Sequence, residues 1–390
     1  MNKNVILLSL CQALLMTGNV LLISVVALIG QSLTNDPDLT TLPVATQFIG
    51  LMLATIPASF VMKAVGRKNG FFLGNAIGIL GALLCIYSLN ITSFLWFCVG
   101  TFMLGVGIGF GTLYRFAAVE VCAPEQKSRA ISLVMAGGVI AALIGPTLAV
   151  HSQEWGEGAM FQGAFIGLLV LYVLALVLLS FVKIPPINQS TVAGEQRSLV
   201  SIFTQPTAVI AVVSAMVGYA VMNLLMTSTP LAMGRVGHEF HHAAHVIEWH
   251  VLGMFVPSFF TGHLINRFGA KRMIYAGCVL MAACIAINLL GQTKSHFFFA
   301  LLLLGVGWNF MFIPATHMLT GIYKEPEKAK AQATNEFLVF SLVTLSALSS
   351  GWLEASFGWY TMNLMMLPVI LFTIALVFLM DRRNLNVLKD

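Results

Sequence analysis

The residue pattern with the most specific chemistry is His238-Glu-Phe-His-His242, which matches the H-E-x-x-H signature of zinc peptidases in full. That chemistry needs both histidines on one face of a helix, a third ligand and a cleft that admits water. Here the pattern occupies a short turn between two strongly apolar segments, with no domain that would build such a cleft. We therefore expect no catalytic residues, no enzyme activity and no bound metal, and interpret the pattern as the solvated entrance of a helix. Capture of a metal ion by these histidines stays open as an alternative.

Charged side chains inside apolar segments are the second candidate for chemistry. Arg115 and Glu120 lie five residues apart near the end of one segment, and Glu336 lies within about two helical turns of the start of another. A charge at the centre of a bilayer costs roughly 2.5–3.5 kcal/mol, less near helix ends, so such residues have a partner or a purpose. For Arg115 and Glu120 we weigh a latch, substrate or coupling chemistry, and interface anchoring. Glu336 could bind and release a proton, or it could pair with Lys63 or Arg115. As a third alternative, it could be an acid at the helix N-terminus that the helix dipole stabilises.

Polar residues recur throughout the apolar segments. Hydrogen bonding between neighbouring helices is the ordinary role of such groups in a membrane. Glu248 and His250, which follow the histidine-rich turn, could belong to a gate. A cavity of amides and aromatic rings would suit a neutral, planar or amphipathic organic molecule. The candidate substrate-binding residues are Gln12, Asn19, Gln47, Tyr114, Arg115, Tyr219, Asn223, Trp308, Asn309 and His317.

Composition places the whole chain in a membrane. Of its 390 residues, 58% are hydrophobic and 9% are charged, whereas soluble domains carry about a quarter charged residues. The net charge of +5 does not indicate nucleic-acid binding, because the basic residues fall in short loops. Segments of about 20 apolar residues can cross a bilayer as helices. We predict an all-α membrane protein with twelve transmembrane helices: Val5–Gly30, Leu42–Met62, Gly70–Leu89, Phe94–Glu120, Ala130–Val150, Met160–Val182, Thr207–Met233, Ala244–Leu264, Met273–Leu290, Phe297–Tyr323, Ala331–Leu353 and Tyr360–Met380.

Basic residues orient these helices. Only Arg235 and Lys294 of the 20 lysines and arginines fall on the side opposite the two termini. Loops rich in lysine and arginine stay in the cytoplasm. We therefore expect a multi-pass protein of the cytoplasmic (inner) membrane with both termini in the cytoplasm.

The chain repeats itself at a spacing of about two hundred residues. Leu104-Gly-Val-Gly107 recurs as Leu304-Gly-Val-Gly307, and Pro57 has a counterpart in Pro257. Two halves of the same topology, related by an axis along the membrane normal, place a binding site at their interface. We predict two pseudo-symmetric six-helix bundles at 1–182 and 206–390, joined by a cytoplasmic linker at 183–205.

Two loops carry a known signature in degenerate form. The segment 59–68, SFVMKAVGRK, resembles the G-x-x-x-D-x-x-G-R-K loop of the major facilitator superfamily, with Lys63 in place of the aspartate. A second degenerate copy is 262–269, GHLINRFG, and Gly137-Gly138 with Gly145-Pro146 resembles the glycine–proline pattern of drug/proton antiporters in that family. The resemblance covers the whole chain. It implies a secondary transporter that works by alternating access, with protons as the coupling ion.

We therefore expect a monomeric secondary active transporter that moves a small organic solute, with membrane lipid around it and no cofactor or nucleic-acid partner. The glycine–proline pattern places export slightly ahead of uptake of a vitamin, siderophore or metal-related ligand. From a different class, the alternative is a membrane-embedded zinc hydrolase or a sensor that transports nothing.

A latch between the halves is the mechanistic hypothesis. Since lysine replaces the aspartate at position 63, the acid of the latch must come from Glu120 or Glu336. We expect Lys63, Arg115, Glu120 and Glu336 to form a cytoplasmic cluster that favours the outward-open state, because a latch must hold in one state and break in the other.

Overall fold

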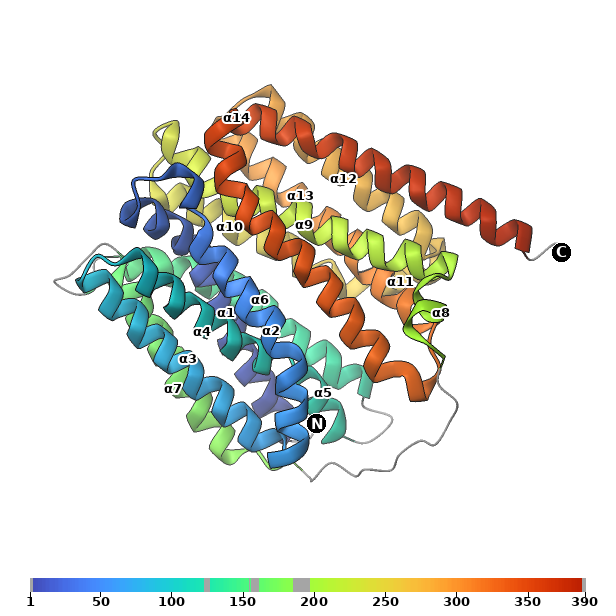
Figure 1. The fold of residues 1–390 in the computed structure, drawn as a ribbon, viewed down its shortest axis with the longest axis horizontal. Coiled ribbons are helices and arrows are strands. Elements are labelled where there is room, and N and C mark those ends of the chain that lie inside the picture. Colours follow the sequence, from blue (N-terminus) through green and yellow to red (C-terminus); the bar gives the residue numbers. More distant parts are fainter. Residues whose placement is uncertain (1–2, 123–126, 154, 156–160, 185–196, 388–390) are drawn as a thin grey trace.

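The computed structural model describes residues 3–122, 127–153, 155, 161–184 and 197–387 as a set of helices (Figure 1), with no strand in these ranges. The N-terminal half contains α1 (Lys3–Leu33), η1 (Pro37–Leu39), α2 (Leu42–Val65), α3 (Arg67–Asn90), α4 (Phe94–Gly111), α5 (Tyr114–Glu120), α6 (Lys127–His151) and α7 (Gln162–Phe181). The C-terminal half contains α8 (Leu199–Phe203), α9 (Pro206–Arg235), α10 (Phe240–Phe255), α11 (Ser258–Phe268), α12 (Ala270–Leu290), α13 (Lys294–Thr320), η3 (Glu325–Glu327) and α14 (Lys328–Val387).

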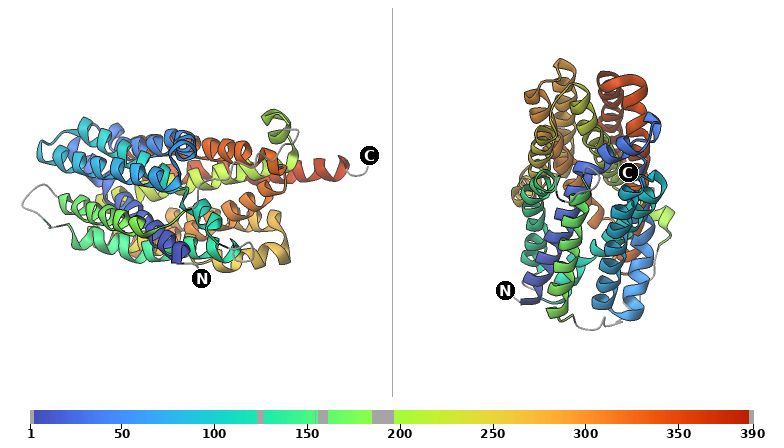
Figure 2. Two further views of the ribbon diagram at one scale, coloured as in Figure 1. Left: turned by 90° about the horizontal axis from the view of Figure 1, so that it is seen from below. Right: turned by 90° about the vertical axis from the view of Figure 1, so that its left-hand side faces the viewer.

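Nine helices in the described part of the chain are long and apolar enough to cross a membrane. The other three predicted spans correspond to α6, to α10 followed by α11, and to one arm of α14, which turns at Gly358. Pro257 marks the break between α10 and α11, because proline has no N–H to donate within a helix. Figure 2 shows the long helices of both halves running in a common general direction.

The same helix pairs pack in both halves. In the N-terminal half α4 packs on α2 and α3, and in the C-terminal half α13 packs on α10 and α12. Glycine permits the close approach in each case. A methyl group on Gly105 would lie 1.9 Å from the carbonyl oxygen of Gln47, and one on Gly305 would lie 2.2 Å from that of His250. The repeated L-G-V-G segments therefore have the same packing function.

The turns after α2 and α11 fix the register of α2 against α10 and α11, which differs by three residues from that of the L-G-V-G segments. Gly66 has φ 86° and ψ 151°, and Gly269 has φ 86° and ψ 149°, a region that favours glycine. These glycines are 203 positions apart (269 − 66), as are the two residues that contact the repeated glycines (250 − 47). Pro57 therefore corresponds to Phe260, and its predicted match with Pro257 is wrong by three residues.

The two halves meet along α2 with α14 and along α6 with α10. We call the side on which α1 begins and α14 ends the terminal side, and the opposite side the distal side. On the distal side Thr41 Oγ1 donates to the Ala347 carbonyl at 2.9 Å and accepts from the Gly351 N–H at 3.0 Å. The rings of Phe161 and Phe240 also meet there edge to face, with centroids 4.9 Å apart. The halves are therefore in direct contact on the distal side.

Part of the predicted linker, 185–196, lies outside the described residues. Its last part is bound to the C-terminal half, since the Arg197 guanidinium donates to both carboxylate oxygens of Glu327 at 2.9 and 2.7 Å. Arg197 also donates to the Ile322 carbonyl at 2.8 Å, and the Lys324 N–H donates to Glu327 at 2.9 Å. We call this set of contacts the linker anchor.

Candidate functional site

A cavity of about 360 Å³ lies between the halves toward the terminal side. Its walls come from the second half of α2, the junction between α4 and α5, the end of α13 and the starts of α3 and α14. Both halves therefore supply residues. Polar and aromatic side chains share these walls, a composition typical of small-molecule sites. The lining residues are Thr55, Ile56, Arg67, Thr112, Leu113, Phe312, Thr316, Leu319, Thr320, Tyr323, Gln332, Ala333, Asn335, Glu336 and Phe340.

The charges of the cavity are Arg67 and Glu336. The Arg67 guanidinium donates to both carboxylate oxygens of Glu120, a bidentate pair within the N-terminal half. Glu336 makes no hydrogen bond or ion pair with the side chains that the structure describes. The side chains of Lys63 and Arg115 lie outside the described part, so the proposed four-residue latch is visible only in its two acids. Of these two acids, Glu120 pairs with Arg67, and Glu336 lines the same cavity as that arginine.

Aromatic rings form the deep end of the cavity. Phe312 and Phe340 line it, and Tyr219 meets both edge to face at 5.6 and 5.7 Å. Trp308 stacks on Phe312 with centroids 4.9 Å apart and planes 12° from parallel. Tyr219 and Trp308 also touch, at 5.4 Å. The structure thus brings two predicted substrate residues, Tyr219 and Trp308, together behind the cavity wall.

The predicted amides form a polar layer within the helix packing, and none of them lines the cavity. The Gln47 amide donates to Asn19 Oδ1 at 2.8 Å, and the Asn223 amide donates to Ser346 Oγ at 3.0 Å. Buried polar atoms without a partner cost about 1–3 kcal/mol each unless water or a ligand satisfies them. Among the described side chains such atoms include Gln12 Oε1, Gln47 Oε1, Asn223 Oδ1 and Trp308 Nε1.

Three other predicted residues have positions that separate them from the cavity. Tyr114 is fully buried in the N-terminal half, where it stacks on Phe71 at 4.2 Å and accepts from Asn75 at 3.0 Å. Asn309 binds Met254 O and Ser258 through its amide nitrogen and Thr261 through its oxygen. His317 is exposed and absent from the cavity wall. Tyr114 and Asn309 therefore join helices.

The predicted gate residues also separate. His250 is fully buried and its Nδ1 lies 2.8 Å from the Leu301 carbonyl. Glu248 instead faces a groove near α6, with its carboxylate 3.3 Å from His245 Nδ1. The two side chains therefore have different surroundings, and their role in a gate stays a prediction.

The H-E-x-x-H pattern lacks the geometry of a zinc peptidase. Glu239 is the N-cap and α10 begins at Phe240, so His238 precedes the helix and cannot share a face with His242. His238 Nε2 instead lies 2.9 Å from the Gln292 carbonyl.

Sequence reasoning missed most of the cavity wall, although a signal was present. Thr316, Thr320 and Tyr323 are spaced four and three apart, and Gln332, Glu336 and Phe340 are spaced four apart. Such spacing puts each set on one helical face. Polar residues at helical spacing indicate both walls, whereas isolated charged residues such as Arg115 do not.

Comparisons with known proteins agree with this architecture. The family model described as Major Facilitator Superfamily matches residues 8–244 and 215–389. The chain is 40% identical over 370 residues to "Riboflavin transporter RfnT" of Brucella anthropi, covering 94% of this chain and 93% of that protein. It is 26% identical to "Uncharacterized MFS-type transporter YddS" of Bacillus subtilis, covering 90% of this chain and 86% of the relative.

Solved structures share the fold at low sequence identity. A bacterial homologue of the human lysosomal transporter Spinster, in an inward-facing and occupied conformation, superposes with a TM-score of 0.74 at 15% identity, covering 97% of this chain and 96% of that one. The human organic anion transporter MFSD10 gives 0.71 at 13% identity, covering 97% and 100%. The all-α fold and the transporter class predicted from the sequence are confirmed, and the chain belongs to the major facilitator superfamily of membrane transporters, which are not enzymes.

Proposed function

We propose that this chain is a secondary active transporter for riboflavin. The observation that carries the proposal is the 40% identity to a riboflavin transporter over 94% of the chain. The vitamin alternative from the sequence thereby moves ahead of drug export. The Gly145-Pro146 pattern that had favoured export has a packing reason, since a methyl group on Gly145 would lie 2.9 Å from Val20 on α1.

The chemistry of the cavity supports a flavin. Riboflavin is neutral, with a flat isoalloxazine ring, an imide edge and a hydroxylated ribityl chain. Phe312 and Phe340 offer apolar ring surface, with Trp308 stacked behind Phe312. Gln332, Asn335 and the hydroxyls of Thr316 and Tyr323 line the same cavity, and these can hydrogen-bond an imide or a ribityl chain. We assign the ring to the aromatic end and the ribityl chain to the polar rim.

The conformation has its cavity toward the terminal side and its contacts on the distal side. We propose that the terminal side faces the cytoplasm, as the basic residues indicate, so that this is an inward-open state in the inner membrane. Alternating access would then be a rocking of the two bundles about the contacts of α2 with α14 and of α6 with α10. Since such a carrier is reversible, the gradients across the membrane set the direction of net transport.

Glu336 is our candidate for proton coupling. It is a carboxylate in the wall of the cavity, unpaired with any described side chain. Its other proposed role, as the latch partner of Lys63 or Arg115, gives a different outcome on mutation. Glu336→Gln should abolish the pH dependence of net transport and leave riboflavin exchange intact if Glu336 carries the proton. If Glu336 is a latch residue, Glu336→Gln should keep the pH dependence and change the reactivity of cysteines in the cavity. The double variant Lys63→Glu with Glu336→Lys should then restore part of the parent's cysteine reactivity.

The test of function is counterflow in proteoliposomes. Vesicles loaded with unlabelled riboflavin should accumulate labelled riboflavin transiently, and empty liposomes should not. Unlabelled riboflavin outside should compete, and ribose should not. Purified protein that neither exchanges riboflavin nor quenches its fluorescence would refute the substrate assignment, while the transporter family would stand.

A further inference from the structure

A groove of about 490 Å³ lies where α6 meets α10 on the distal side, apart from the transport cavity. Both halves contribute to it, because α6 belongs to the N-terminal half and α10 to the C-terminal half. Four of the nine histidines of the chain line it, together with one carboxylate: His151, His241, His242, His245 and Glu248. Imidazole and carboxylate are ligands of Zn²⁺ and other divalent transition metals.

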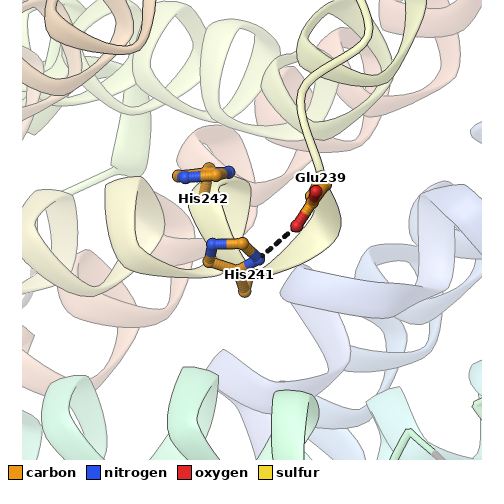
Figure 3. Close-up of side chains that lie close together, drawn as sticks. All are labelled: Glu239, His241 and His242. Atoms are coloured by element: carbon orange, nitrogen blue, oxygen red, sulfur yellow. Dashed lines mark ion pairs between the residues drawn. The ribbon is translucent and has the colours of Figure 1, made fainter.

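Three side chains at this groove already converge. One ligand atom from each of Glu239, His241 and His242 lies within 4.8 Å of the others (Figure 3). The Glu239 carboxylate is 3.1 Å from His241 Nδ1, and the two imidazole rings are 3.8 Å apart. Tetrahedral zinc with bonds of about 2.1 Å needs ligand atoms about 3.4 Å apart. Glu239 and His241 are 75% and 53% exposed, so rotation of free side chains can supply the remaining movement.

His242 has a nitrogen lone pair on Nε2. Lys294 Nζ contacts His242 Nε2, and an ammonium can only donate, so Nε2 is the acceptor. A metal ion could take the place of this ammonium on the same lone pair. Lys294 is exposed on a long, flexible side chain and can withdraw.

His151 offers a fourth ligand from the other half. Its Nδ1 lies 2.8 Å from the Thr147 carbonyl, which can only accept, so Nδ1 carries the proton and Nε2 carries the lone pair. A carbonyl on one ring nitrogen that fixes the other for a metal is the usual arrangement of metal-binding histidines. His151 is exposed in the same groove, so its side chain is free to turn toward α10.

We propose that Glu239, His241, His242 and His151 form a regulatory site for a divalent transition metal such as Zn²⁺, which ties α6 to α10. Bound metal would hold the distal side closed, and the carrier would remain open only on the terminal side. Transport would therefore be inhibited reversibly by the ion. The site shares Glu239 and His242 with the H-E-x-x-H pattern but does not use His238, and it is a binding site without catalysis.

The first test is titration of the purified, metal-free protein with ZnCl₂, followed calorimetrically. We expect one Zn²⁺ per chain, with affinity reduced by about tenfold or more in His241→Ala/His242→Ala. Lys294→Met should bind more tightly than the parent, because the competing ammonium is gone. His263→Ala is the matched control, since His263 is exposed on α11 and outside the groove. An affinity unchanged in the double variant would overturn the site.

The second test addresses the bridge between the halves. His151→Ala should weaken Zn²⁺ binding and abolish the effect of Zn²⁺ on a cysteine placed at Thr316, whose labelling from the terminal side should rise with Zn²⁺ in the parent. If His151→Ala behaves as His263→Ala does, the bridge is refuted. Equal melting temperatures of all variants without metal will show that each one folds. These readouts do not depend on the substrate, so failure of the riboflavin proposal would leave them unaffected.

Discussion

At the scale of residues, the cavity wall combines the surfaces of aromatic rings with neutral hydrogen-bonding side chains. Phe312 is the residue that connects them, because it lines the cavity and stacks on Trp308. The predicted amides lie behind this layer and form bonds between helices. Their unpartnered oxygens mark positions that a different conformation of the carrier could expose to substrate.

We predict that Phe312→Ala weakens riboflavin binding, because a stacked aromatic pair contributes about 0.5–1.5 kcal/mol beyond the area it buries. That range corresponds to roughly a twofold to tenfold change in Kd. The measurement is quenching of riboflavin fluorescence by purified protein. Phe259→Ala is the control, since Phe259 is exposed on α11 and lies outside the cavity. Equal losses in both variants would remove Phe312 from the substrate site.

The linker anchor gives a prediction about pH. Hydrogen bonds from Arg197 and from the Lys324 N–H hold the pKa of Glu327 well below its ordinary value. A depressed pKa means that the interaction stabilises the fold above the unfolded pKa of about 4.3 and is lost as the pH falls below it. Glu327→Gln should therefore lower the melting temperature at pH 7, and the difference from the parent should shrink below about pH 4. A difference that is constant with pH would show that the charge of Glu327 is irrelevant.

At the scale of elements, glycine sets how closely the helices approach. Gly105 and Gly305 each face a carbonyl of the neighbouring helix at a distance that leaves no room for a methyl group. Each contacted atom is a backbone carbonyl oxygen, which cannot rotate away as a side chain can. The two helices would therefore have to separate to accept a side chain at either glycine.

Gly105→Ala and Gly305→Ala should each destabilise the protein by about 1–3 kcal/mol, the usual cost of overpacking. Melting temperature in detergent is the measurement, since the thermal midpoint falls with stability. Gly262→Ala is the matched control, because a methyl group there meets nothing within 4 Å. If all three variants melt alike, the close contacts do not limit stability.

Much of this element-level picture could be predicted from the sequence. Long apolar segments indicated the helices, because a membrane span needs about 20 apolar residues. The L-G-V-G repeat indicated their duplication, because close approach of two helices requires glycine at the contact. The breaks at Thr112-Leu113 and Pro257 were missed, since the predicted spans ran through them as continuous apolar sequence. The cavity wall depends on which helical faces meet between the halves, and one apolar helix does not reveal its partner.

At the scale of the whole molecule, the two halves are two bodies in contact on the distal side. Thr41, the N-cap of α2, is hydrogen-bonded to α14 there. A methyl group at Gly351 would lie 2.8 Å from Thr41 Oγ1. Opening of the distal side in the opposite state of the carrier would have to break this contact.

A disulfide across this contact should stop transport. We expect Thr41→Cys with Gly351→Cys to cross-link under mild oxidation, to abolish counterflow and to recover it on reduction, because the distal side could no longer open. The pair Ile56→Cys with Ala333→Cys lines the cavity on the terminal side and serves as the comparison. Full transport by the oxidised distal pair would rule out opening at Thr41.

The linker anchor also divides the covalent connection between the halves into two parts, a connecting segment (the tether) and the contacts that bind its end to the C-terminal half (the clamp). The tether runs from Lys183 to Arg197, fourteen steps along the chain (197 − 183), which span at most about 50 Å when fully extended. The clamp fastens its far end to Glu327, directly before α14, the helix that carries Gln332 and Glu336. A force on the linker would therefore act at the first turn of a helix that lines the cavity, so the connection between the two halves ends at one wall of the site.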